Sequence, residues 1–156
     1  MKMTPFRTGN DAGRSALMGV DEVERLLGEV FPQIHEGGRD FHIVSVGEKC
    51  ARMRLDVSEK HLRPGGTVSG PSMFALADLA LYVAILANIG PEALAVTTNL
   101  NINFLSKPSD PVLIGDCRLL KLGKRLAVGE VSIVSGDGER LFAHATGTYS
   151  IPPGKG

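Results

Sequence analysis

One acidic side chain, Asp78, stands out because it lies within a long apolar stretch of the 156-residue chain. It is the only charged residue between Pro64 and Pro91. A carboxylate in apolar surroundings is costly unless it is hydrogen-bonded, paired or placed at a cleft. Such acids gather at active sites, where they serve as nucleophiles or general bases. Asp78 is therefore the main catalytic candidate; the alternatives are an acid on a solvated helix stripe or one paired with a buried arginine.

A glycine-rich loop, residues 63–71, precedes Asp78 and is a second candidate feature. Free backbone N–H groups at the N-terminus of a helix can polarise a carbonyl oxygen or bind an anion. Gly70 would let a ligand approach the backbone closely, and its eight-residue separation from Asp78 corresponds to about two turns of helix. The alternative is that glycine is needed here only for the dihedral angles of a turn.

The element that must position Asp78 is a long helix, predicted over residues 72–89, where all but three residues are apolar or Ala. Pro71 suits the first turn of a helix, and Gly90 suits its end. A helix that is apolar on nearly every side is either buried centrally or crosses a membrane. The central acid, a length below about 20 residues and the lack of basic flanks argue against a membrane span. We therefore expect a central, buried helix.

Hydrophobic periodicity places shorter elements around this helix. A short helix is expected from residue 21 to about residue 30. Strands are expected at residues 41–47, 50–57, 96–105, 112–121, 126–134 and 139–150. Because strands and helices do not alternate, the pattern argues against a parallel sheet. We predict an α+β fold in which one antiparallel sheet curls around the central helix.

Overall composition narrows the class of protein. Seventeen basic and 17 acidic residues leave no net charge at pH 7, so we expect no nucleic-acid or membrane partner. With only Cys50 and Cys117, and no HxxxH or HExxH spacing, we expect neither a disulfide scaffold nor a metal site. The first 15 residues lack the apolar stretch of a secretory signal, so we expect a cytoplasmic protein.

Two further polar clusters can each be interpreted in two ways. Asn99, Asn101 and Asn103 alternate along one predicted strand, where they could line a polar cleft, a subunit seam or a solvated face. The basic residues of segment 118–125 could bind nucleotide phosphates or form a solvated hairpin end.

Three stretches of the chain resemble one known family. They are HLRPGGTVSGPSMFALADLALYVA, AVTTNLNINFLSKP and GKRLAVGEVSIVSGDGERLFAHATGTY, and they resemble the hotdog-fold acyl-CoA thioesterases. The most similar branch is the phenylacetic-acid-degradation type, within the 4-hydroxybenzoyl-CoA thioesterase superfamily. The resemblance implies a hotdog domain over residues 38–150, with a five- or six-stranded antiparallel sheet around one long helix. Residues 1–37 would form an N-terminal arm with a short helix, and residues 151–156 a C-terminal tail.

The resemblance also implies an activity: hydrolysis of an acyl- or aryl-CoA thioester to the carboxylic acid and free CoA, without a cofactor. It places the nucleophile or general base at Asp78 and the carbonyl-polarising N–H at Gly70. It places a water-positioning hydroxyl, supplied by the partner subunit, at Thr97. Active sites would sit at the dimer interface of a homodimer or homotetramer. We expect further substrate contacts from four residues near the helix N-terminus: Arg63, Ser69, Met73 and Phe74.

Two other functions stay open. Hotdog folds also host hydratases and dehydratases, which generally combine a histidine with an acid, and His61 is near in sequence. A non-catalytic acyl-CoA-binding module is the second alternative, because Arg63 and Ser69 stand where the family usually has Asn and His. The presence of Asp78 favours the hydrolase.

Overall fold

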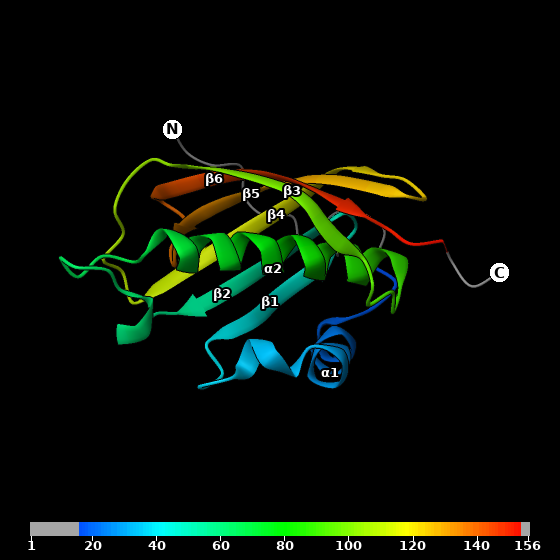
Figure 1. The fold of residues 1–156 in the computed structure, drawn as a ribbon. Helices are drawn as coiled ribbons and strands as arrows, with labels where there is room; N and C mark the ends of the chain where they lie inside the picture. The colour runs from blue at the N-terminus through cyan, green and yellow to red at the C-terminus, as the bar shows by residue number, and fades with distance from the viewer. Residues whose placement is uncertain (1–15, 154–156) are drawn as a thin grey trace.

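A six-stranded sheet wraps around one long helix, α2 (Gly70–Ile89), in the computed structural model, which describes residues 16–153 (Figure 1). The strands are β1 (Phe41–Gly47), β2 (Cys50–Asp56), β3 (Val96–Phe104), β4 (Val112–Leu122), β5 (Leu126–Ser135) and β6 (Leu141–Ser150). Their order across the sheet is β1-β2-β4-β5-β6-β3, and every pair is antiparallel. The structure confirms the predicted α+β hotdog fold, with β1 and β3 at the two edges.

The helix α2 forms the centre of the core, and 12 of its residues are buried. By length and composition α2 could cross a membrane, but its burial against the sheet accounts for its apolar character. It begins two residues earlier than predicted, at Gly70, because Ser69 caps it. The Ser69 Oγ accepts a hydrogen bond from the N–H of Ser72 at 3.3 Å, which satisfies one of the free donors of the first turn.

Two glycines allow α2 to lie close to the sheet. Gly129 of β5 and Gly147 of β6 are directly opposite each other. A Cβ on Gly129 would lie 2.6 Å from Leu81 of α2, and one on Gly147 would lie 2.5 Å from the same side chain. Because real Cβ atoms do not come this close to their neighbours, a side chain at either position would displace Leu81.

Both ends of the described chain join this core. Before the sheet come the helix α1 (Val20–Val30) and the 3-10 helix η1 (Pro32–His35), and Val23 and Leu27 of α1 are fully buried. The short helix predicted within an N-terminal arm is therefore part of the folded unit. Ile151, predicted to begin the tail, is also buried. The remainder of the predicted arm and tail, residues 1–15 and 154–156, lies outside the described residues.

Candidate active site

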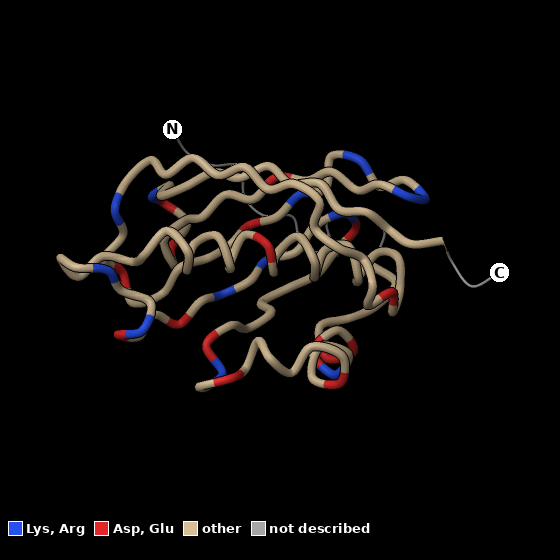
Figure 2. Tube along the Cα trace, viewed as in Figure 1, with Lys and Arg blue, Asp and Glu red and all other residues tan. Residues whose placement is uncertain are grey.

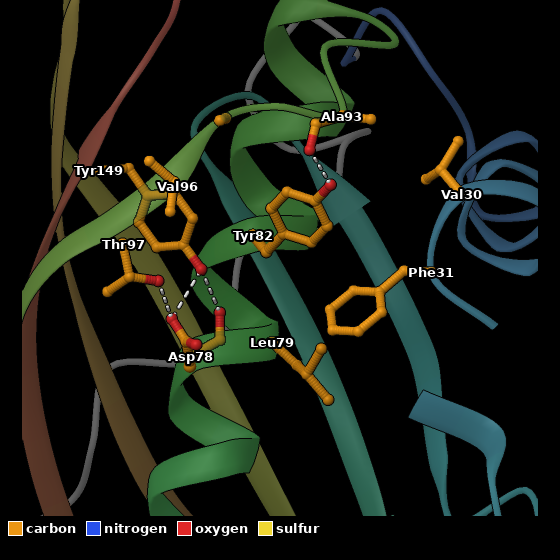
Figure 3. Close-up of a pocket in the computed structure, with 10 residues that line it drawn as sticks. Val30, Phe31, Asp78, Leu79, Tyr82, Ala93, Val96, Thr97 and Tyr149 are labelled. Carbon is orange, nitrogen blue, oxygen red and sulfur yellow. Dashed lines mark hydrogen bonds between the residues drawn. The ribbon is translucent and has the colours of Figure 1, made fainter. Parts of the chain in front are cut away.

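Asp78 lies midway along α2, on a stripe of the helix that the sheet covers incompletely. It is the one charged residue of α2, and Figure 2 shows the rest of this helix in tan, the colour of residues other than Lys, Arg, Asp and Glu. Two hydroxyl groups bind its carboxylate: Thr97 of β3 and Tyr149 of β6 each donate to Oδ1 over 2.6 Å (Figure 3). In the described part of the chain, no group donates to Oδ2 and no basic side chain pairs with Asp78. Oδ2 is thus the oxygen left for a water or a substrate.

The register of β3 against β6 explains why both hydroxyls reach this carboxylate. Thr97 pairs with Tyr149, and the pairing then skips Thr98, which forms a β-bulge. Counted back from the inward-facing Leu100, strict alternation would put Thr98 on the side of α2. Because of the bulge, Thr97 faces α2 instead of Thr98. The hydroxyls of Thr97 and of its cross-strand partner Tyr149 therefore both reach Asp78.

Tyr149 is a site residue that the sequence did not reveal. Its side chain is only 3% exposed. Burial raises the pKa of its hydroxyl well above the ordinary value, and the negative charge of Asp78 acts in the same direction. Tyr149 therefore stays protonated, and able to donate, at the pH of ordinary assays. The ring of Tyr82 stacks on it with centroids 6.1 Å apart, which restrains its orientation.

Asp78 lines a cavity of about 280 Å³ between α2, the start of β3 and the C-terminal end of α1 (Figure 3). The wall away from Asp78 is apolar and includes Phe31, Leu79 and the ring of Tyr82. The rings of Phe31 and Tyr82 pack edge to face, with centroids 6.3 Å apart. The Tyr82 hydroxyl donates to the carbonyl oxygen of Ala93 at 2.7 Å. A carboxylate thus stands at one side of a cavity whose opposite wall is apolar.

The N-terminus of α2 offers one free backbone donor. The N–H groups of a first helical turn have no acceptor within the helix. Ser72 donates to the Oγ of Ser69 at 3.3 Å, Met73 donates to its carbonyl oxygen at 3.2 Å, and Pro71 has no N–H. Among the described residues, the N–H of Gly70 is then the donor of this turn without an acceptor. It lies at the positive end of the helix dipole, which suits the predicted polarisation of a carbonyl oxygen.

The four residues predicted to contact substrate lie in different environments in the structure. Phe74 is 40% exposed and lines a second, apolar cavity of about 410 Å³ beside Gly70. Met73 was predicted to contact the substrate, but it is buried in the core because its side of α2 faces the sheet. Ser69 serves as the helix cap. Arg63 is exposed on the loop and lines neither of these two cavities.

Thr97 binds Asp78 of the same chain, whereas the family resemblance implied a hydroxyl from the partner subunit. The backbone N–H of Gly70, in contrast, lies far from the carboxylate of Asp78 in the same chain. The two residues are eight positions apart on one helix, about 12 Å along its axis at about 1.5 Å per residue. A single thioester carbonyl therefore cannot contact both groups of one chain.

His61, the histidine of the hydratase alternative, ends the short 3-10 helix η2 (Glu59–His61). Its Nδ1 accepts a hydrogen bond from the N–H of Ser58 at 2.9 Å, and its Nε2 lies 3.7 Å from Asp40. Burial lowers the pKa of this imidazole. The ring holds together the segment before α2 and forms no pair with Asp78 among the contacts of the described chain.

The remaining polar clusters lie apart from Asp78. The three alternating asparagines are exposed along edge strand β3. Lys124 and Arg125 lie between β4 and β5 and line a third cavity, of about 420 Å³, near the C-terminal end of α2. The described residues contain no group of three or more His, Cys, Asp or Glu side chains that could hold a metal ion.

Comparison with known proteins agrees with this geometry. The model of the thioesterase superfamily matches residues 65–142. A protein of Saccharolobus solfataricus named "Putative esterase" is 31% identical over 137 residues, covering 86% of this chain and 87% of that protein. A 1,4-dihydroxy-2-naphthoyl-CoA hydrolase of Listeria monocytogenes is 26% identical over 109 residues, covering 70% and 88%. The crystal structure of a "putative thioesterase" from Silicibacter sp. TM1040 has a TM-score of 0.80 and 49% identity, covering 96% of this chain and 100% of that one.

The fold and the site therefore define a hotdog thioester hydrolase, and the chain belongs to the thioesterase superfamily. The matched segment contains Gly70, Asp78 and Thr97. It begins after α1 and ends two residues into β6, so α1 and the part of β6 that carries Tyr149 lie outside it.

Proposed function

We propose that this protein hydrolyses an acyl-CoA thioester to the carboxylic acid and free CoA, with Asp78 as nucleophile or general base. The observation that carries the proposal is the asymmetric anchoring of Asp78, whose Oδ1 binds Thr97 and Tyr149 beside a cavity with an apolar far wall. A carboxylate fixed through one oxygen presents the other in a defined position, which lowers the cost of orientation during the reaction. The relative from Listeria, a CoA hydrolase by name, supports coenzyme A as the thiol.

The second catalytic group comes from a second copy of the chain. Because Gly70 and Asp78 are about 12 Å apart on one helix, Gly70 of one copy would polarise the carbonyl on which Asp78 and Thr97 of the other act. Edge strand β3 supports a homodimer, since its exposed Val96 and Phe104 offer apolar surface that a second copy would bury.

In the nucleophilic form of this mechanism, Oδ2 of Asp78 forms a bond to the carbonyl carbon. The electron pair moves onto the carbonyl oxygen, where the N–H of Gly70 and the helix dipole stabilise it. Collapse expels the CoA thiolate, and water then hydrolyses the resulting anhydride. In the general-base form, Asp78 takes a proton from a water that attacks the same carbon.

The test is the substitution Asp78→Asn, which removes the charge and keeps the size of the side chain. We expect release of the CoA thiol from a panel of acyl- and aryl-CoA substrates to fall by at least about 10²-fold. The control is Asp21→Asn on the exposed side of α1, which should leave the rate unchanged. Wild-type rates in a folded Asp78→Asn protein would exclude the proposed role. If the wild type turns over no substrate and is only thermally stabilised by acyl-CoA, the protein is a binding module.

A further inference from the structure

We infer that the cavity beside Asp78 holds the acyl group of the substrate and selects apolar groups without a hydroxyl, with Phe31 as a specificity-determining residue. This inference rests on the proposed hydrolysis of an acyl-CoA thioester. It concerns the wall that the C-terminal end of α1 adds to the site, a part of the chain outside the matched family segment.

The chemistry of the lining indicates which part of the substrate the cavity receives. Asp78 lies on one side, and Phe31 and Leu79 form the wall away from it. Among the described residues that line this cavity there is no Lys or Arg. The phosphates of CoA would find no positive partner there, whereas an apolar acyl group would be removed from water. With the carbonyl carbon at Asp78, the acyl group would therefore extend toward Phe31 and the CoA away from it.

In the part of the chain that the structure describes, each hydroxyl group that lines the cavity already donates a hydrogen bond within the protein. Thr97 and Tyr149 donate to Asp78, and Tyr82 donates to the carbonyl oxygen of Ala93. A substrate hydroxyl buried at the Phe31 side would give up its water contacts and find no free hydroxyl donor in exchange. Burying such a group without full compensation is unfavourable, so hydroxylated acyl groups are selected against.

The size of the cavity sets a lower limit on the preferred acyl group. Its volume of about 280 Å³ is larger than the roughly 150 Å³ of an engineered protein cavity that binds benzene. An acyl group with one aromatic ring, or with about six carbons, fits this space, while an acetyl group would leave most of it empty. Phe31 is 37% exposed, and its edge-to-face packing on Tyr82 holds the ring in place.

The first experiment compares kcat/KM of the wild type for four thioesters: acetyl-, hexanoyl-, phenylacetyl- and 4-hydroxyphenylacetyl-CoA. Hexanoyl- and phenylacetyl-CoA should exceed acetyl-CoA by at least about tenfold. Phenylacetyl-CoA should exceed its hydroxylated analogue by about tenfold, the lower range for burying a poorly compensated hydroxyl. Turnover in which acetyl-CoA or the hydroxylated analogue is preferred overturns this inference and leaves the proposed function standing. No turnover with any thioester overturns both.

The second experiment tests the wall itself with Phe31→Ala. We expect kcat/KM for phenylacetyl-CoA to fall about tenfold, mainly through KM, while the value for acetyl-CoA changes less than twofold. The control is Leu126→Ala at the start of β5, a leucine that is 41% exposed and lines none of this cavity. If Phe31→Ala does not fold, Phe31→Leu should show a smaller loss in the same direction. An unchanged preference in either folded variant contradicts the role of Phe31.

Discussion

Both hydroxyl groups that bind Asp78 end at the same carboxylate oxygen, which makes the two oxygens unequal. Of the two donors, the buried Tyr149 is the more distant from Asp78 in sequence, at 71 residues along the chain. A hydrogen bond to a charged group contributes about 1.5–3 kcal/mol. Tyr149 touches Asp78 rather than the reacting atoms, so at the scale of single residues it is a positioning residue.

We predict that Tyr149→Phe lowers kcat by about tenfold and changes KM less than twofold, because the ring still fills its place while Asp78 loses one donor. Steady-state hydrolysis of a preferred acyl-CoA measures both constants. The matched control is Tyr82→Phe, which removes the hydroxyl of the stacked ring, a group bound to Ala93 and not to Asp78. Equal losses of kcat in the two variants would show that the hydrogen bond from Tyr149 to Asp78 has no specific effect on catalysis.

For the secondary-structure elements, the sequence was sufficient to predict the bounds of the two α-helices and the six strands. It was not sufficient to predict which side chains of an element face the core. Each predicted strand agrees with the structure to within two residues at either end, because alternation and Gly/Pro signals are local. Alternation alone would turn Thr98 toward α2, and only the pairing with β6 shows the bulge that turns Thr97 there. Met73 was misplaced because a helix that is apolar all round does not indicate which side faces the sheet.

The close packing of α2 on β5 and β6 leads to a prediction about stability. Gly147→Ala should lower the free energy of unfolding by about 1–3 kcal/mol, since the new Cβ would displace Leu81. Chemical denaturation measures this change. The control is Gly28→Ala on the exposed side of α1, where a Cβ meets nothing within 4 Å. That substitution should raise the stability by about 0.5–1 kcal/mol, because alanine is the better helix former. Equal effects of both substitutions would contradict the tight fit of Leu81.

At the scale of the whole molecule, the proposed site requires two copies, and mixing two inactive variants tests this requirement. Gly70→Pro removes the backbone donor and Asp78→Asn removes the carboxylate, so each variant alone should be nearly inactive. In a heterodimer, one of the two sites would combine an intact Gly70 with an intact Asp78. A 1:1 mixture with random pairing should recover roughly a quarter of wild-type activity per chain.

The control for this mixture pairs Asp78→Asn with Thr97→Val, because Thr97 and Asp78 belong to the same half of the site. That mixture should recover nothing beyond the activity of Thr97→Val alone. Failure of the first mixture to recover activity, after exchange of subunits is demonstrated, would mean that Gly70 and Asp78 do not act in one site across two copies.

The close approach of Leu81 to Gly129 and Gly147 also divides α2 into two sides that should differ in how readily they accept substitutions. The side against the sheet is packed too closely for a ligand to pass, so ligands approach from the stripe that carries Phe74 and Asp78. Substitutions that change what is hydrolysed can then accumulate at the α1 wall without disturbing the contacts that hold the fold together. On this scaffold, we expect substitutions at Phe31 to change the acyl preference with little loss of stability, whereas a side chain at Gly129 or Gly147 should destabilise the fold.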